Sequence, residues 1–227
     1  MKKAVIYLLP FFLLMAVSIT ASAQKPVVSF GAGGGYGTMK ESFKVSVTDN
    51  SATGENAVKK TGYDLNYTTL LGFADLEFKY SWLTALLEAS YAKADYVDYT
   101  SNTIDRLLKL DPAGFENAQL ISAAFYLGYS VFPARRFQIP ILIGAGADYV
   151  IGKPIDSIHY SLRFKARAKF YLSNRFGIFG GYSGSYGFTQ FNNEYNIAPE
   201  PAANVERQKL SGYFEGGITY MLGFSKH

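Results

Sequence analysis

The sequence predicts an all-β protein, an eight-stranded antiparallel transmembrane up-and-down β-barrel, and three observations lead to this fold class. Over eight segments of the 227-residue chain, apolar and polar side chains alternate with a period of two. The connections between these segments alternate between short turns and long polar stretches, as in outer-membrane barrels. Tyrosine, phenylalanine and glycine are frequent, with 18, 18 and 22 residues, which favours strands with close backbone contacts.

The first 23 residues have the pattern of a cleavable secretory signal peptide. Lys2 and Lys3 precede an apolar run over residues 4–19, and the small residues that follow predict cleavage between Ala23 and Gln24. A membrane-anchoring helix is the alternative, but the apolar run is shorter than the ~20 residues that a spanning helix needs. We therefore expect a signal peptide over residues 1–23 and a barrel domain over residues 24–227.

Charge and cysteine content exclude several classes of protein. The chain has 22 Lys and Arg against 18 Asp and Glu, and signal cleavage removes two lysines, so the mature protein has little excess charge and no nucleic-acid partner is expected. It has no cysteine, which excludes disulfides, thiolate metal sites and a lipoprotein anchor. No metal-ligand spacing is evident, and we expect no cofactor.

The segment over residues 158–172 shows the alternation most clearly. One face is wholly apolar along its length, and the other is polar and basic. A helix would scatter these charges around all sides, whereas a strand separates them. The apolar face is longer than the 9–11 residues that a membrane-crossing strand needs. It contains Ile158, Tyr160, Leu162, Phe164, Ala166, Ala168, Phe170 and Leu172, and the other contains His159, Ser161, Arg163, Lys165, Arg167, Lys169 and Tyr171.

Seven other segments alternate in the same way and complete a set of eight strands. An even number allows an up-and-down barrel to close with both chain ends on one side. In chain order, the eight expected strands cover residues 28–36, 70–80, 83–91, 121–131, 137–149, 158–172, 176–188 and 210–224.

The connections indicate the orientation of the barrel. Tight turns are expected at 81–82, 133–136 and 173–175, and long polar connections at about 39–65, 95–117, 150–157 and 189–209. Short periplasmic turns and long extracellular loops are typical of outer-membrane barrels. The first and fourth long connections are the candidates for contacts with a surface partner.

A soluble β-sandwich or a lipocalin-like barrel is the alternative fold. These proteins also alternate, but their inner face is apolar and their outer face is polar. Here the charged face is the one rich in glycine and serine, which suits a narrow lumen. We therefore assign the apolar face to lipid and the charged face to the interior.

The inner face then carries balanced charge. An eight-stranded barrel is just wide enough for side chains to fill, and buried charges must be paired. The balance predicts an ion-pair network that plugs the lumen, with an ion-selective pore as the alternative. The predicted network consists of the acids Asp75, Glu77, Glu88, Asp148 and Glu215 and the bases Lys79, Arg163, Lys165, Arg167 and Lys169.

His159 and Ser161 form the strongest enzymatic candidate, because a His-x-Ser pair on a strand resembles the lipid A deacylase barrels. Those enzymes use His, Ser and an acid on their lipid-facing side. Here both residues are in phase with Arg163, which predicts that they face the lumen, and no acid follows within twenty residues to orient the histidine. A histidine at the lumen or rim is the simpler interpretation.

Both ends of the predicted barrel resemble a known family. The opening strand, Val-Ser-Phe-Gly-Ala-Gly-Gly-Gly-Tyr-Gly, and the closing Gly-Tyr-Phe-Glu-Gly-Gly-Ile-Thr-Tyr-Met-Leu-Gly-Phe look like the outer-membrane β-barrel domain family, which includes OmpA/OmpX-type eight-stranded barrels and PorT-type barrels of type IX secretion. The resemblance implies the cell outer membrane as location and outer-membrane lipid and lipopolysaccharide as surroundings. Phe224 resembles the C-terminal insertion signal that the barrel assembly machinery reads, although residues 225–227 follow it.

Three functional hypotheses follow from the sequence. The first is a non-enzymatic barrel with a structural or surface-interaction role and an unidentified surface partner. The second is an accessory component of a protein secretion apparatus, as the PorT-type resemblance implies. The third is a lipid A-modifying barrel enzyme that uses His159.

Overall fold

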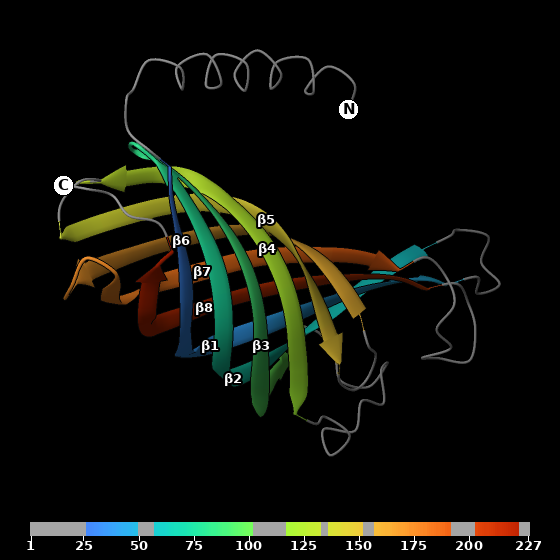
Figure 1. Cartoon of the computed structure of the whole chain (residues 1–227). Helices are drawn as coiled ribbons and strands as arrows, with labels where there is room; N and C mark the ends of the chain where they lie inside the picture. The colour runs from blue at the N-terminus through green and yellow to red at the C-terminus, as the bar shows by residue number, and fades with distance from the viewer. Residues whose placement is uncertain are drawn as a thin grey trace, which may run out of the picture.

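A computed structural model describes residues 26–49, 57–101, 117–132, 136–151, 157–191 and 203–222, which form one closed antiparallel sheet of eight strands (Figure 1). Each strand pairs with its neighbours in the chain, and β1 also pairs with β8. This confirms the predicted fold class. The strands are β1 (Val27–Asp49), β2 (Ala57–Tyr80), β3 (Leu83–Ser101), β4 (Ala118–Val131), β5 (Phe137–Ile151), β6 (Ser157–Tyr171), β7 (Phe176–Phe191) and β8 (Ala203–Met221). Within the described residues, no helix has the length and apolar character needed to cross a membrane.

Three short connections lie at one end of the barrel, which we call the turn end. Ser81, between β2 and β3, and Phe132, after β4, both have positive φ angles, 56° and 55°, which allow the chain to reverse within a few residues. Between β6 and β7, the Ser173 hydroxyl accepts hydrogen bonds from the backbone N–H groups of Arg175 and Phe176. The turns at 81–82 and 173–175 confirm the sequence prediction, whereas most of the predicted turn at 133–136 lies outside the described residues. The opposite end, where the longer connections begin, is the loop end.

Four adjacent strands extend further toward the loop end than the sequence indicated. β1 and β2 have 23 and 24 residues, and β3 and β8 have 19 each, whereas β4 to β7 have 14 to 16. The predicted long connections at about 39–65, 95–117 and 189–209 are therefore wrong in extent, since β1 and β2 pair as far as Asp49 and Ala57, β3 continues to Ser101 and β8 begins at Ala203. The outward residues of these strand extensions are polar because they lie beyond the apolar belt. Their composition therefore resembles that of a loop.

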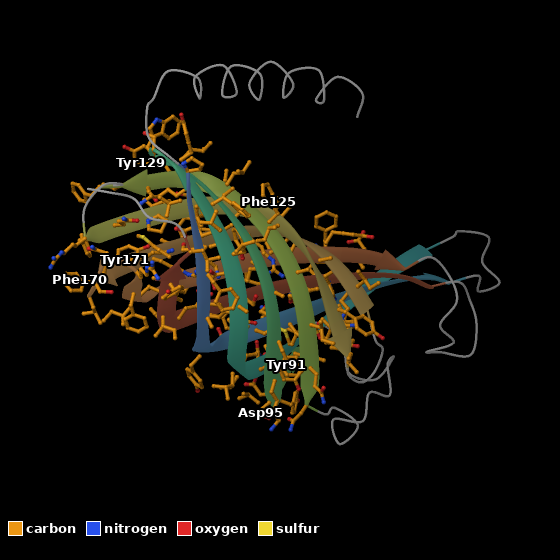
Figure 2. The ribbon with its side chains drawn as sticks, viewed as in Figure 1. Tyr91, Asp95, Phe125, Tyr129, Phe170 and Tyr171 are labelled. Carbon is orange, nitrogen blue, oxygen red and sulfur yellow. The ribbon has the colours of Figure 1, made fainter. Side chains whose placement is uncertain are left out.

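The two faces of the sheet differ sharply in chemistry. Apolar side chains cover the outside of the barrel, where Phe125 and Tyr129 point away from the sheet (Figure 2). On β6, Leu162 is 65% exposed, whereas Lys165 is fully buried. A water-soluble protein does not expose a continuous apolar belt of this kind, but a barrel surrounded by hydrocarbon requires one. The exposed apolar residues are therefore the lipid-facing surface.

Glycines on the inner face leave room for long charged side chains. A Cβ atom at Gly31 would lie 2.3 Å from a carboxylate oxygen of Asp75, and one at Gly146 would lie 2.7 Å from the Arg163 guanidinium. In a narrow barrel, a residue without a side chain on one strand therefore allows a large one on the next. The glycine-rich inner face and the charged inner face are two parts of the same packing arrangement.

Some sequence predictions fall outside the described residues. These are the signal peptide over residues 1–23, the cleavage between Ala23 and Gln24, and the C-terminal signal at Phe224. They stay predictions.

Placing a charge on the apolar belt tests the assignment of the faces. We expect Phe164→Arg to reduce the free energy of folding into a bilayer by about 2–4 kcal/mol, because Phe164 is exposed on the middle of β6. Leu172→Arg, one residue past the turn end of the same strand, should cost only about 0–1 kcal/mol. Denaturant titration in lipid vesicles measures both, and equal costs would contradict the assigned depth.

Candidate functional site

The lumen of the barrel holds the candidate site. All ten charged residues predicted for it point into the barrel, and they lie in three groups that follow one another from the turn end to the loop end. The turn-end group contains Glu77, Lys79 and Lys169, the central group contains Asp75, Glu88, Lys165, Arg167 and Glu215, and the loop-end group contains Asp148 and Arg163.

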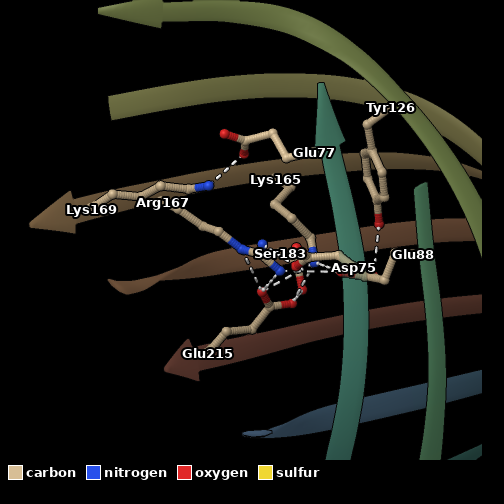
Figure 3. A network of polar contacts seen from close by, with 9 residues as sticks. All are labelled: Asp75, Glu77, Glu88, Tyr126, Lys165, Arg167, Lys169, Ser183 and Glu215. Atoms are coloured by element: carbon tan, nitrogen blue, oxygen red, sulfur yellow. Dashed lines mark hydrogen bonds and ion pairs between the residues drawn. The ribbon is translucent and has the colours of Figure 1, made fainter. Parts of the chain in front are cut away.

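Arg167 is the centre of the central group, as Figure 3 shows. Its guanidinium donates hydrogen bonds to Asp75, to Glu88 at 3.2 Å and to Glu215 at 3.2 Å. Lys165 pairs with the same Glu88 and, at 3.0 Å, with Glu215. Two bases and three carboxylates from four strands therefore form one connected cluster, so each carboxylate is in direct contact with a base inside the sheet.

Polar and aromatic side chains complete this cluster. Ser183 donates a hydrogen bond to Glu215, and the Tyr126 hydroxyl donates one to Glu88 at 3.4 Å. The Arg167 guanidinium lies 4.8 Å from the ring centroid of Phe73 and 4.5 Å from that of Phe179. Such cation–π contacts are strongest where the cation is desolvated. The rings therefore occupy space around the cations that water would otherwise fill.

The turn-end group combines an ion pair with neutral hydrogen bonds. Lys169 pairs with Glu77, and the Lys79 ammonium donates to the Gln138 amide oxygen at 2.8 Å. Nearby, the Thr84 and Ser130 hydroxyls lie 2.8 Å apart. The buried apolar residues Leu86, Tyr126 and Leu142 pack together on the same side of the lumen.

The loop-end group is larger than the sequence analysis indicated. Asp148 pairs with the predicted Arg163 and also with Lys209 at 2.6 Å, while Arg207 pairs with Glu41 at 2.6 Å. Glu41, Arg207 and Lys209 were missed because they were placed in connections. The alternation could have revealed Arg207 and Lys209, since positions 207 and 209 continue the inward positions 211, 213 and 215 of the last predicted strand.

An apolar cluster lies around this loop-end group. Phe43 and Tyr63 stack with ring centroids 4.7 Å apart, and the Arg207 guanidinium lies 4.7 Å from the centroid of Phe43. Met39, Leu65 and further buried residues of β1 to β5 belong to the same cluster. Aromatic and aliphatic side chains therefore occupy the part of the lumen nearest the loop end.

Between the central and loop-end groups lies a small polar chamber. Its volume is about 30 Å³, which is enough for one or two water molecules. Five serines line it, together with charged residues of both neighbouring groups. The serines are Ser90, Ser122, Ser183, Ser185 and Ser211.

His159 and Ser161 face the lumen, and both are buried. The His159 imidazole Nε2 lies 3.8 Å from a Glu41 oxygen, and the Ser161 hydroxyl accepts a hydrogen bond from Arg163 at 3.0 Å. Neither side chain reaches the lipid-facing surface. No group of His, Asp and Glu in the described part of the chain has the arrangement of a metal site.

Comparisons with known proteins bear on the fold. No family model and no curated protein sequence matches the chain. Among solved structures, the outer membrane protein OprG from Pseudomonas aeruginosa is 10% identical, with 88% of this chain and 99% of that chain covered and a TM-score of 0.50. Neisserial surface protein A is 9% identical, with coverages of 82% and 96% and a TM-score of 0.40.

These observations define the class of the protein. The closed eight-stranded sheet and its likeness to OprG show the fold of OmpA/OmpX-type outer-membrane β-barrels. Together with the continuous apolar belt, this fold places the protein in the cell outer membrane. The turn end is then periplasmic, and the loop end is extracellular.

Removing the central cation tests how strongly the barrel depends on the network. Arg167→Met leaves three buried carboxylates undercompensated, so we expect it to lower the free energy of unfolding by about 3–5 kcal/mol. Lys93→Met breaks an exposed ion pair with Asp95 and should cost about 0–1 kcal/mol. Urea unfolding in vesicles measures both, and a similar small loss in the two variants would show that the network contributes little.

Proposed function

We propose that the protein is a non-enzymatic outer-membrane barrel with a lumen closed by the ion-pair network and a structural or surface-interaction role. One observation carries the proposal. Interacting side chains occupy the lumen at the turn-end, central and loop-end levels, and the chamber between the central and loop-end groups measures only about 30 Å³. Such a chamber does not have room for a substrate.

The pairing of charges favours closure over conduction. A selective pore lines its constriction with a ring of one sign of charge and keeps a continuous path of water. Here each level contains both signs in direct contact, and the buried ions compensate one another. Among the described residues, the inward acids are Glu41, Asp75, Glu77, Glu88, Asp148 and Glu215, and the inward bases are Lys79, Arg163, Lys165, Arg167, Lys169, Arg207 and Lys209.

The uneven strand lengths support a role at the cell surface. A strand crosses the bilayer with about 9–11 residues, so β1 and β2, with 23 and 24 residues, extend well beyond it. Their extracellular parts pair with each other, and β8 continues the sheet on the far side of β1. A paired sheet outside the membrane offers a surface for partners that does not depend on the lumen.

Closure of the lumen is tested by solute flux. Vesicles that contain the purified barrel should swell in small sugars no faster than empty vesicles, and planar bilayers should show no steps of ion current of porin size. A porin reconstituted in parallel gives the positive control. Steady conductance by the wild-type barrel would overturn the closed-lumen proposal.

The enzymatic alternative has its own test. Because His159 and Ser161 are buried in the lumen, we expect no release of fatty acid from lipid A by the purified protein. His159→Ala should give the same background. Activity in the wild type that is lost in this variant would instead establish a deacylase.

A further inference from the structure

We propose that a groove on the outer wall of the barrel binds a phosphorylated glycolipid of the surrounding leaflet. The groove has a volume of about 540 Å³ and lies on the extracellular half of the wall, across β7, β8, β1, β2 and β3. It is separate from the lumen network, so the proposal does not depend on whether the lumen conducts. Its principal side chains are Thr38, Lys40, Asn66, Thr68, Val97, Tyr182 and Leu210.

Strand pairing brings the polar residues of the groove together. Thr38 of β1 lies opposite Thr68 of β2, and Lys40 lies opposite Asn66. Each is the outward member of its alternating pair, because the neighbouring Met39 and Tyr67 are buried inside the barrel. Two hydroxyls, an amide and an ammonium group therefore lie side by side at the extracellular edge of the lipid-facing wall.

Apolar side chains flank this polar centre on both sides. On one side, Leu210 is exposed, and Tyr182 packs edge-on against Phe214 with ring centroids 5.4 Å apart. On the other side lies Val97, the extra residue of a β-bulge where the register between β2 and β3 shifts next to Asn66. Bulges re-aim side chains, and this one leaves Val97 exposed on the outer wall.

The groove lies where the apolar belt ends. On β1, the outward residues change from Tyr36, which belongs to the belt, to Thr38 and Lys40. A ligand that fills the groove therefore contacts apolar and hydrogen-bonding surfaces at once, which is the chemistry of an amphiphile. Because the wall faces the bilayer, the amphiphile at hand is a membrane lipid.

The charges of the groove indicate the type of headgroup. The Lys40 ammonium pairs with Asp64 at 2.7 Å, with side chains 46% and 17% exposed, and Asn66 donates to Asp98 at 2.8 Å. The exposed ammonium can donate to a phosphate, whereas the two carboxylates can only accept hydrogen bonds. A headgroup with both an anionic group and several hydroxyls satisfies both kinds of partner. A phosphorylated glycolipid carries this combination on a sugar ring, whereas phosphatidylglycerol has only two hydroxyls on a flexible glycerol.

Native mass spectrometry of the purified barrel tests this site, with lipid A as the probe and phosphatidylglycerol as the competitor. We expect one lipid A molecule to stay bound and to resist displacement by phosphatidylglycerol. Lys40→Gln should weaken its binding about tenfold, because it removes a charge-assisted hydrogen bond. The matched control is Lys93→Gln, since Lys93 is also an exposed lysine paired with an aspartate and lies outside the groove. It should leave binding unchanged.

A second variant distinguishes the contribution of the groove's shape from that of the Lys40 charge. Thr68→Phe keeps Lys40 but fills the groove, and it should weaken binding by at least as much. Heat-modifiable gel mobility checks that each variant is folded. Equal losses for Lys40→Gln and Lys93→Gln, full binding by Thr68→Phe, equal displacement by phosphatidylglycerol, or a second copy of the chain bound in place of lipid would each overturn the proposal.

Discussion

The pairing of Arg167 and Lys165 with Asp75, Glu88 and Glu215 is the interaction on which the rest of the barrel depends. Hydrocarbon offers no hydrogen-bond partners, so the sheet must close and the outer wall must be apolar. Closure with eight strands leaves a narrow interior, and polar residues that are excluded from the outer wall must fit there. The central cluster meets this constraint because acids and bases from four strands contact one another directly.

The same constraint accounts for residue types that do not themselves carry charge. Gly31 and Gly146 leave space for Asp75 and Arg163, and Ser183 supplies a hydrogen bond to Glu215. Glycine and serine are small enough to stand opposite a guanidinium or a long ammonium side chain in a narrow lumen. The alternation that marks a strand in the sequence therefore also divides the residues by size, with bulky apolar side chains outside and small or charged ones inside.

Much of the architecture was predictable from local pattern. A period of two over residues 158–172 gives both the strand β6 and its faces, and the three tight turns follow from breaks in that pattern. The full length of β1, β2 and β8 was not predictable from hydropathy, because outward residues such as Lys40 and Ser42 are polar where the wall lies beyond the belt. Following every second residue along the inward face of each strand, and not hydropathy, would have included Glu41, Arg207 and Lys209.

Which residues pair with which depends on strand register and tilt, and these are set by the closed sheet as a whole. Lys165 and Glu88 are 77 residues apart in the chain, and no local pattern joins them. The groove near Lys40 has the same origin, since it needs β7, β8 and the bulge in β3 at one level of the wall. Composition indicates which side chains are available, and only the closed sheet brings them into contact.

The chain has no cysteine, so single nitroxide labels can be attached without altering other residues. Paramagnetic accessibility of labels at residues 160 to 163, in the barrel reconstituted in vesicles, tests most directly whether the apolar wall meets hydrocarbon while the charged residues lie inside. Labels at 160 and 162 should be open to oxygen, which concentrates in lipid, and labels at 161 and 163 should be shielded from it. Access of a water-soluble nickel reagent to 162, together with oxygen access to 163, would contradict the account.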